Sequence, residues 1–306
     1  MTQNKNQQRN LDSKNHPEVN GLVISRFGSE ADIELDDGEI LRCHLRRKLE
    51  HLVCGDRVLC RQQGKLQAVV TEILPRRNVL ERPIRYQGIK AVAANLDQMI
   101  IVISPEPEFS PLILDKYLVV AENAELQPLI VFNKCELLDK YPDIRQQLSI
   151  YEALGYPLIF TSVKKNIALQ EFEQLLGLHC NVLVGQSGVG KSSLVNALLP
   201  HINAEVNQIS DNSGLGQHTT TASRLYHLKH QGSLIDSPGI REFSMQHFET
   251  HQLIRGYQEI FQLGKQCKYR DCRHTKEPGC AVKLAVDKQQ INPQRYQRYI
   301  KILEQN

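Results

Sequence analysis

The stretch "NVLVGQSGVGKSSLVNALL" at residues 181–199 places a glycine-rich turn between an apolar run and an amphipathic run. Residues 185–192 within it fit the pattern G-x-x-x-x-G-K-[ST]. A strand directly before this pattern and a helix directly after it form the context in which such loops bind phosphate groups. A turn that is rich in glycine without binding a ligand is the weaker interpretation. The stretch therefore predicts an α/β domain built around a phosphate-binding loop.

The residue types of this loop explain the chemistry. Glycines allow backbone N–H groups to turn towards phosphate oxygens, and the following helix adds the positive end of its dipole. Lys191 is expected to contact the β- and γ-phosphates, and the hydroxyl of Ser192 to ligate Mg²⁺. The predicted nucleotide-binding residues of the loop are Gly185, Gln186, Ser187, Gly188, Val189, Gly190, Lys191, Ser192 and Ser193.

A second motif, Asn133-Lys134-Cys135-Glu136, follows the apolar run "PLIVF" at residues 128–132. A carboxylate at Glu136 can accept from the N1–H and the 2-amino group of guanine, and adenine offers no such pair of donors. Thr161 and Ser162 follow another apolar run, as in the loops that contact guanine O6 through their backbone. A polar turn after a strand is common by itself, but beside a phosphate loop these residues predict guanine recognition.

Two further segments fit the switch regions of a GTPase. "LIDSPG" at residues 234–239 contains D-x-x-G, in which Asp236 would hold Mg²⁺ through water and the Gly239 amide would contact the γ-phosphate. The glycine-flanked loop at residues 214–221 supplies threonines, of which Thr220 is assigned to Mg²⁺.

The group that positions the attacking water is expected in the first of these switches. Ile240 stands where many GTPases carry a water-orienting glutamine, so intrinsic hydrolysis should be slow. His218 is the candidate catalytic residue, and an ordinary surface histidine is the alternative.

These motifs occur in an unusual order. In an ordinary guanine-nucleotide-binding domain the phosphate loop comes first and the base-reading loop comes last. Here the base-reading loop at residues 133–136 precedes the phosphate loop at residues 185–192, and both switches follow. This order predicts a circularly permuted domain, which is physically reasonable when the termini of a domain lie close together.

The pattern of apolar residues divides the chain into three predicted folds. Residues 31–45, "ADIELDDGEILRCHL", alternate on both sides of Asp-Asp-Gly and predict a hairpin in a five-stranded OB-fold barrel. From about residue 80, continuous apolar runs separated by amphipathic stretches predict a mostly parallel sheet with crossover helices. From about residue 244 the pattern is mostly helical. We expect a disordered tail at 1–18, an RNA-binding OB-fold at 19–75, a permuted GTPase domain at 76–243 and a zinc-binding helical domain at 244–306.

Basic residues are expected on the first and last of these folds. The outward positions of the barrel carry Arg42, His44, Arg46, Arg47 and Lys48, for which a solvated face is as good an interpretation as an RNA-binding one. In the final helix, Tyr296, Tyr299, Ile300 and Leu303 form an apolar stripe, with Arg295, Arg298 and Lys301 off it. The tyrosines are expected to pack rather than to stack on bases.

Four potential metal ligands cluster near the C-terminus. Cys267, Cys272, His274 and Cys280 provide three thiolates and an imidazole within a short segment. Such ligands suit tetrahedral Zn²⁺ in a structural site, and unrelated cysteines beside a histidine are the weaker interpretation. Lysines and arginines around the cluster favour an RNA-binding surface.

Composition bounds the class of protein. The chain has 306 residues, of which 41% are hydrophobic and 23% charged, as in a soluble globular protein. The apolar run at residues 99–103 is too short to span a bilayer, and the polar N-terminus is not a signal peptide. Of the eight cysteines, the five outside the cluster have no paired spacing, which favours metal binding over disulfides in a reducing cytoplasm.

The motif order, with "HTTT" at residues 218–221 and "DSPG" at residues 236–239, resembles the family of ribosome small-subunit-dependent GTPase A, also called RsgA, YjeQ or EngC. The resemblance covers nearly the whole chain and implies an OB-fold, a circularly permuted GTPase domain and a C-terminal zinc domain. "RRNVLERP" at residues 76–83 looks like the family's linker. The chain departs from the family's pattern at Glu136, usually Asp, and at Gln217, where a basic residue often precedes the histidine.

The resemblance also implies an activity. It points to a cytoplasmic bacterial GTPase that binds GTP and GDP with Mg²⁺, carries one structural Zn²⁺, and is stimulated by the 30S subunit late in its maturation. It further implies binding of 16S rRNA by a monomer that has no membrane contact. The alternatives are an RNA-bound assembly checkpoint that uses GTP mainly as a ligand, and a P-loop ATPase whose base-reading loop has been misinterpreted.

Overall fold

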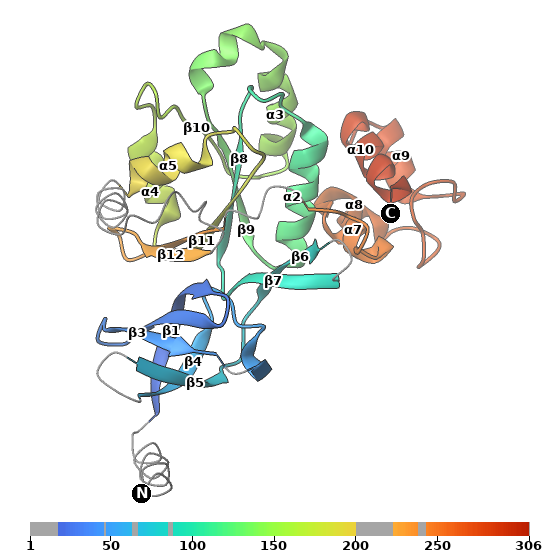
Figure 1. Cartoon of the computed structure of the whole chain (residues 1–306). Coiled ribbons are helices and arrows are strands. Elements are labelled where there is room, and N and C mark those ends of the chain that lie inside the picture. The colour runs from blue at the N-terminus through green and yellow to red at the C-terminus, as the bar shows by residue number, and fades with distance from the viewer. Residues whose placement is uncertain are drawn as a thin grey trace, which may run out of the picture. The chain divides into compact units, whose positions relative to one another are not determined.

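The computed structural model describes residues 18–45, 47–62, 67–84, 88–199, 223–237 and 243–305 (Figure 1). The chain divides into two compact units. One contains residues 1–96 and 217–239, and the other contains residues 97–216 and 240–306. The expected tail and the predicted residues His218, Thr220 and Gly239 lie outside the described residues.

The first unit contains a closed five-stranded barrel. Antiparallel pairings join β1 to β2, β2 to β3, β4 to β5 and β1 to β4, and a parallel pairing of β3 with β5 completes the ring. This is the connectivity expected of an OB-fold. The strands are β1 (Glu18–Phe27), β2 (Glu30–Leu35), β3 (Ile40–His44), β4 (Arg57–Gln62) and β5 (Gln67–Ile73), with the short helix η1 (Arg47–Leu49) between β3 and β4.

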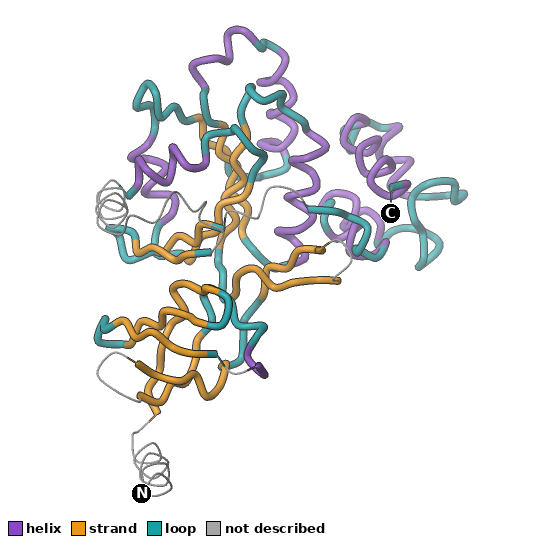
Figure 2. Tube along the Cα trace, viewed as in Figure 1, coloured by secondary structure: helices purple, strands orange, loops and turns teal. Residues whose placement is uncertain are grey.

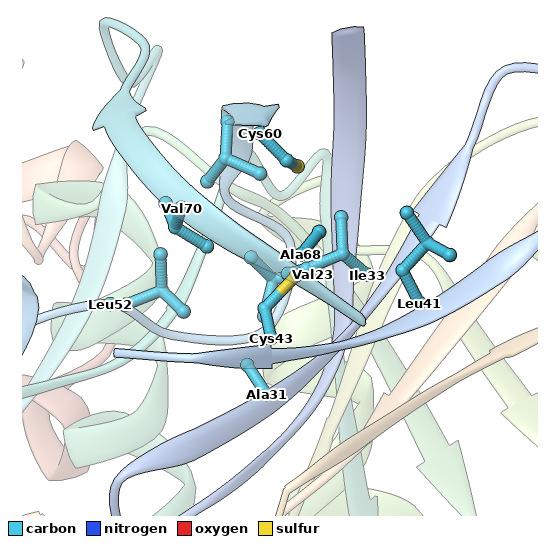
Figure 3. Packing of buried hydrophobic residues seen from close by; sticks show 10 residues of the cluster. Val23, Ala31, Ile33, Leu41, Cys43, Leu52, Cys60, Ala68 and Val70 are labelled. Atoms are coloured by element: carbon cyan, nitrogen blue, oxygen red, sulfur yellow. The ribbon is translucent and has the colours of Figure 1, made fainter. Parts of the chain in front are cut away.

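The alternating pattern of the hairpin explains the core of the barrel. Ala31 and Ile33 on β2 and Leu41 and Cys43 on β3 are fully buried, while the residues between them face outward. Figure 3 shows these side chains converging with those of the other strands. The predicted hairpin is therefore confirmed.

Two strand pairs complete the first unit. β6 (Val79–Ile84) pairs with β7 (Gly88–Ala94), and β12 (Arg224–His227) pairs with β13 (Ser233–Asp236), both antiparallel. The fully buried carboxylate of Asp56 accepts from the Val53 amide at 2.8 Å and from Arg76 at 2.7 Å, which fixes the loop before β4.

The second unit contains a parallel sheet in the order β10-β9-β8-β11. Figure 2 shows its strands in orange and the helices around them in purple. Its strands are β8 (Gln98–Ile103), β9 (Gln127–Phe132), β10 (Leu158–Phe160) and β11 (Cys180–Val184). Its helices are α2 (Pro111–Asn123), α3 (Asp143–Ala153), α4 (Leu169–Leu176) and α5 (Lys191–Leu198). All three strand pairings are parallel, so the carboxyl ends of the strands lie along one edge, where ligands bind in such sheets.

Four helices follow in the C-terminal part of this unit, and the first of them packs against α2. They are α7 (Thr250–Arg255), α8 (Gln258–Gly264), α9 (Ala281–Asp287) and α10 (Pro293–Glu304). A Cβ on Gly256 would lie 2.6 Å from the Cα of Val119, so this glycine permits the close approach of α7 to α2. The Asn123 side chain donates to the Gln252 carbonyl at 2.9 Å across the same contact.

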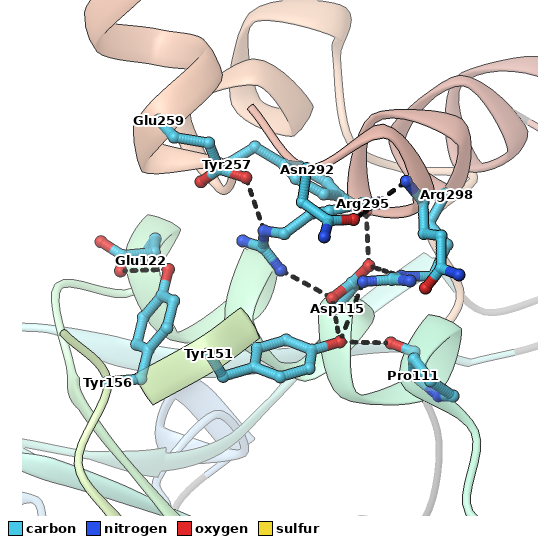
Figure 4. Close-up of polar contacts among 11 residues, drawn as sticks. Pro111, Asp115, Glu122, Tyr151, Tyr156, Tyr257, Glu259, Asn292, Arg295 and Arg298 are labelled. Atoms are coloured by element: carbon cyan, nitrogen blue, oxygen red, sulfur yellow. Dashed lines mark hydrogen bonds and ion pairs between the residues drawn. The ribbon is translucent and has the colours of Figure 1, made fainter. Parts of the chain in front are cut away.

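A buried polar network joins α10 to α2 (Figure 4). The carboxylate of Asp115 on α2 is fully buried and accepts from Arg295 and Arg298 on α10. Arg295 also pairs with Glu259 on α8, and Tyr151 on α3 donates to Asp115 at 2.6 Å. The structure therefore corrects the expectation from the helix pattern, which placed Arg295 and Arg298 off the buried stripe.

The physical reason is the position of Asp115. An ionised carboxylate without compensation is too costly to bury, so α2 requires cations from the helix that covers it. Burial would lower the pKa of Arg295, but Asp115 and Glu259 outweigh it and raise that pKa well above its usual value. Burial raises the pKa of Tyr151, which keeps its hydroxyl protonated as a donor.

We predict that Asp115→Asn lowers the free energy of unfolding of this unit by about 3 to 5 kcal/mol, because Arg298 loses its carboxylate and Arg295 keeps only that of Glu259. Guanidinium chloride titration followed by circular dichroism measures this change. The control is Glu125→Gln, which removes an exposed partner of Arg255 and should cost at most about 1 kcal/mol. Equal effects of the two substitutions would contradict the role given to the network.

Candidate functional site

The predicted phosphate loop lies at the carboxyl end of β11 and leads into α5. Gly185, Gly188 and Gly190 have φ values of 147°, 83° and 96°, in the region that favours glycine. A Cβ on Gly185 would lie 2.3 Å from the carbonyl oxygen of Val102 on β8. The glycines of the motif are therefore required by the backbone path.

The polar side chains of the loop differ in their surroundings. The ammonium of Lys191 donates to the carbonyls of Gly185 and Gln186 at 2.6 and 2.7 Å. It therefore lies beside the first two residues of the phosphate loop. Ser187, Ser192 and Ser193 are exposed, whereas Val189 is buried. Hydroxyls at the helix N-terminus are thus open to a ligand.

The predicted base-reading loop touches the phosphate loop directly. The buried side chain of Asn133, just after β9, donates through Nδ2 to the Val189 carbonyl at 3.0 Å. Its Oδ1 lies 3.4 Å from the hydroxyl of Thr161 in the second base loop. A Cβ on Gly190 would lie 2.3 Å from Nδ2 of Asn133. The structure therefore brings three separate motifs into one place.

Lys134 makes a second connection between the two loops. Its backbone is left-handed, with φ 59°, and turns the chain from β9 into η2 (Cys135–Lys140). Its ammonium donates to the Gly188 carbonyl at 2.7 Å and to the Glu106 carbonyl at 2.6 Å. The side chain thus lies along the space between the base-reading loop and the phosphate loop.

Glu136 has the feature expected of a base acceptor. Its Oε2 atom is buried and has no hydrogen-bond partner among the described residues. The neighbouring Cys135 amide donates to the Thr161 carbonyl at 3.0 Å, and burial raises the pKa of the Cys135 thiol. Thr161 and Ser162 are fully buried, and their amides donate to the carbonyls of Phe132 and Ile167 at 2.8 and 3.2 Å. Their contact with a base stays a prediction.

Asp236 is the remaining predicted site residue that the structure describes. It ends β13, opposite Arg224 of β12, in the unit that contains the barrel. Residues 200–222 and 238–242, which include the expected catalytic histidine, are not among the described residues.

The four predicted metal ligands converge. The ligand atoms of Cys267, Cys272, His274 and Cys280 all lie within 4.8 Å of one another, and the group could hold a metal ion. Nδ1 of His274 is 3.5 Å from Sγ of Cys267 and 3.5 Å from Sγ of Cys280, and the two sulfurs are 3.9 Å apart. Thiolates about 2.3 Å from a tetrahedral ion lie about 3.8 Å apart, so the spacing fits four-coordinate binding.

The surroundings of the cluster support ligation. Burial lowers the pKa of His274, so the imidazole is neutral and its lone pair is free to bind a metal at neutral pH. A Cβ on Gly264 would lie 3.0 Å from Nε2 of His274, so a larger residue there would crowd the ring. Tyr296 donates to the His274 carbonyl at 2.6 Å and Tyr299 to the Arg273 carbonyl at 2.8 Å, which fixes the loop on α10. The tyrosines pack, as predicted.

The basic strip expected on the barrel is partly neutralised. Arg42 pairs with Asp32 and Glu30 on the adjacent strand, and His44 lies 3.2 Å from Glu30. Arg46 is outside the described residues. The described part of this strip thus favours a mixed-charge surface over a simple RNA-binding face.

Two sets of residues were missed by sequence reasoning. Glu106 and its neighbours, in the loop after β8, contact Lys134 and the phosphate loop. The only feature of the sequence that could have indicated these contacts is the Glu-Pro pair at residues 106–107, directly after a buried strand. Asp115 was missed as well, although an acidic residue on the apolar face of α2 is itself a sign of a buried partner.

In the part of the chain that the structure describes, no helix has the length and apolar character needed to cross a membrane.

Comparison with known proteins gives consistent results. A model of the RsgA GTPase family matches residues 73–246, more than half of the chain. The small ribosomal subunit biogenesis GTPase RsgA of Haemophilus influenzae (strain PittGG) is 47% identical over 290 residues, covering 93% of this chain and 84% of that protein. The protein of the same name from Actinobacillus pleuropneumoniae serotype 5b is 44% identical, covering 98% of this chain and 93% of that protein.

Two solved structures resemble the chain. YjeQ from Thermotoga maritima superposes with a TM-score of 0.76 at 33% identity, covering 94% of this chain and 99% of that one. YloQ, described as a circularly permuted GTPase, superposes with a TM-score of 0.74 at 28% identity, covering 94% and 95%. The predicted order of folds, with a barrel, a permuted sheet domain and a C-terminal Cys/His cluster, is confirmed.

We predict that Cys272→Ser abolishes the binding of one metal ion per chain, because a buried thiolate ligand is lost. Elemental analysis of the purified protein by mass spectrometry measures the metal content. Cys180→Ser, which changes a cysteine of β11 outside the cluster, is the matched control and should retain the metal. Retention of a full equivalent by Cys272→Ser would contradict the assignment.

Proposed function

The chain belongs to the RsgA GTPase family, and we propose that it hydrolyses GTP to GDP and phosphate during late maturation of the small ribosomal subunit. In this proposal the 30S subunit stimulates the reaction. The relatives named above are small ribosomal subunit biogenesis GTPases, which supports this assignment.

The bonding between the base-reading and phosphate loops carries the proposal. Asn133 and Lys134 donate to carbonyls of the phosphate loop, and Glu136 presents an unpartnered buried oxygen in the same region. In an ATPase, an unrelated polar turn after β9 would not be expected to form these hydrogen bonds to the phosphate loop. The arrangement therefore favours a guanine nucleotide over ATP.

Each proposed residue has a distinct task. Glu136 accepts from the guanine donors, and the backbone of Thr161 and Ser162 contacts the base. The phosphate loop, Gly185 to Ser193, wraps the phosphates, and Lys191 offsets their charge. Ser192, Thr220 and Asp236 would hold Mg²⁺, which neutralises the charge that develops on the phosphates. Gly239 contacts the γ-phosphate, and His218 positions the attacking water.

The Cys/His cluster and its surroundings support a zinc-stabilised RNA contact. Three thiolates and an imidazole without a carboxylate suit structural Zn²⁺. Lys265 lies over the ring of Phe261 at 4.8 Å, and Lys268 over the ring of Tyr269 at 5.5 Å. Both rings are partly exposed, and exposed aromatic rings beside cations suit unpaired bases of an RNA such as 16S rRNA.

The proposal assigns these functions to a monomer with an OB-fold at residues 19–75, the GTPase domain at 76–243 and the zinc domain at 244–306. The second candidate is an RNA-bound checkpoint for which GTP is mainly a ligand. It is favoured only if hydrolysis does not respond to the ribosomal subunit.

We predict that unlabelled GTP displaces a labelled GTP analogue from the protein at least about 100-fold more effectively than ATP, because a well-placed set of hydrogen bonds rejects a base that lacks them. Fluorescence competition measures the two affinities. Lys191→Ala should weaken triphosphate binding, and the exposed Lys229→Ala is the control. Equal displacement by ATP would favour the ATPase alternative.

We also predict that GTP turnover is slow for the protein alone and rises when 30S subunits are added. His218→Ala should leave GTP affinity intact and lower stimulated turnover by at least about tenfold, as expected when a positioned group is lost from the transition state. Phosphate release with and without subunits measures both rates. Absence of stimulation would favour the checkpoint, and unchanged stimulated turnover would remove His218 from the mechanism.

A further inference from the structure

Glu106 contacts both ends of the segment that carries the base-reading residues. Its backbone carbonyl accepts from the ammonium of Lys134 at 2.6 Å, and its carboxylate accepts from the hydroxyl of Tyr141 at 2.9 Å. The buried hydroxyl of Ser104 also donates to that carbonyl, at 2.8 Å, and fixes the turn that presents it. Glu106 thus spans the segment from Lys134 to Tyr141.

The same loop also rests on the phosphate loop. Lys134 is shared between the carbonyls of Glu106 and Gly188. The ring of Pro107 packs at this point, since its Cδ lies 3.4 Å from the position of a Cβ on Gly188. The loop after β8 therefore contacts both halves of the proposed nucleotide site.

We infer that Glu106 and Tyr141 are positioning residues for base recognition, an inference that rests on the proposed guanine-nucleotide site. They hold the two ends of η2, and Glu136 lies in the first turn of this short helix. A glutamate has one more rotatable side-chain bond than the aspartate common at this position in GTPases. Fixing the backbone beneath Glu136 reduces the freedom that the carboxylate loses when it binds guanine.

The hydrogen bond between Tyr141 and Glu106 lies at the surface, so its loss should affect nucleotide binding more than the stability of the protein. The Tyr141–Glu106 bond is exposed to solvent, and an exposed hydrogen bond contributes little to the stability of the whole unit. Hydrogen bonding to Glu106 raises the pKa of Tyr141, so the hydroxyl stays protonated and donates throughout the neutral range. Removing this hydroxyl should therefore change base recognition without unfolding the protein.

The test compares the affinities of GTP and ITP, measured by fluorescence competition for Tyr141→Phe and the wild type. Hypoxanthine keeps the N1–H of guanine but lacks its 2-amino group, so ITP makes one bond fewer to Glu136. Loss of this one exposed hydrogen bond should weaken GTP binding about two- to tenfold. ITP binding should weaken less, so the ratio of GTP to ITP affinity should fall.

Three further variants isolate the contact. Glu106→Ala should match Tyr141→Phe, because it keeps the backbone carbonyl but removes the acceptor of the hydroxyl. Glu106→Gln should behave nearly as wild type, because its amide oxygen still accepts. The matched control is Tyr156→Phe, which removes a hydroxyl that lies 3.5 Å from Glu122, away from the base-reading segment.

The outcomes separate this inference from the proposed function. Wild-type protein that does not prefer GTP to ATP contradicts the proposed function itself. If the wild type prefers GTP, an unchanged GTP to ITP ratio in both Tyr141→Phe and Glu106→Ala overturns the positioning role. Equal weakening of both nucleotides with a lower melting temperature overturns it too, since that result indicates a general structural role.

Discussion

The donation of the Asn133 amide to the Val189 carbonyl is the contact on which the proposed site depends. It joins the loop after β9 to the loop after β11, and these strands lie on either side of β8. Because the strands are parallel, the loops at their carboxyl ends meet whatever the order of the strands in the chain. The unusual motif order therefore requires no change in the geometry of the site.

This contact also explains why glycine is required at position 190 of the phosphate loop. Gly190 must lack a side chain because Asn133 occupies the space in which a Cβ would lie. Gly185 is limited in the same way by the Val102 carbonyl. Lys134 adds a second connection through Gly188. The glycines of the motif thus serve the approach of the base-reading loop as well as the binding of phosphate.

A second set of contacts connects the metal cluster to the sheet domain. Tyr299 holds the loop of the cluster on α10, and Arg295 and Arg298 of the same helix pair with Asp115 on α2. Buried ion pairs contribute less to stability than their geometry suggests, but each charge requires its partner. The docking of α10 on α2 therefore supplies the cations that the buried Asp115 carboxylate needs.

The sequence was informative wherever the signal is local. The strand–loop–helix at residues 181–199, the hairpin at residues 31–45 and the Cys/His cluster were all predicted because their residues lie close together in the chain. The burial of Arg295 was not predicted, because nothing in α10 reveals the carboxylate on α2 that it meets. The contact of Glu106 with Lys134 was not predicted either, because it depends on how a loop after one strand packs beside another.

The central claim is that the base-reading and phosphate loops form one guanine-nucleotide site in a permuted chain. The most direct measurement is a crystal structure of the protein with GDP. The account predicts that the guanine N1 and 2-amino groups bond to the Glu136 carboxylate while the phosphates lie on residues 185–192. A nucleotide whose phosphates occupy that loop while its base lies away from residues 133–136 would contradict the account.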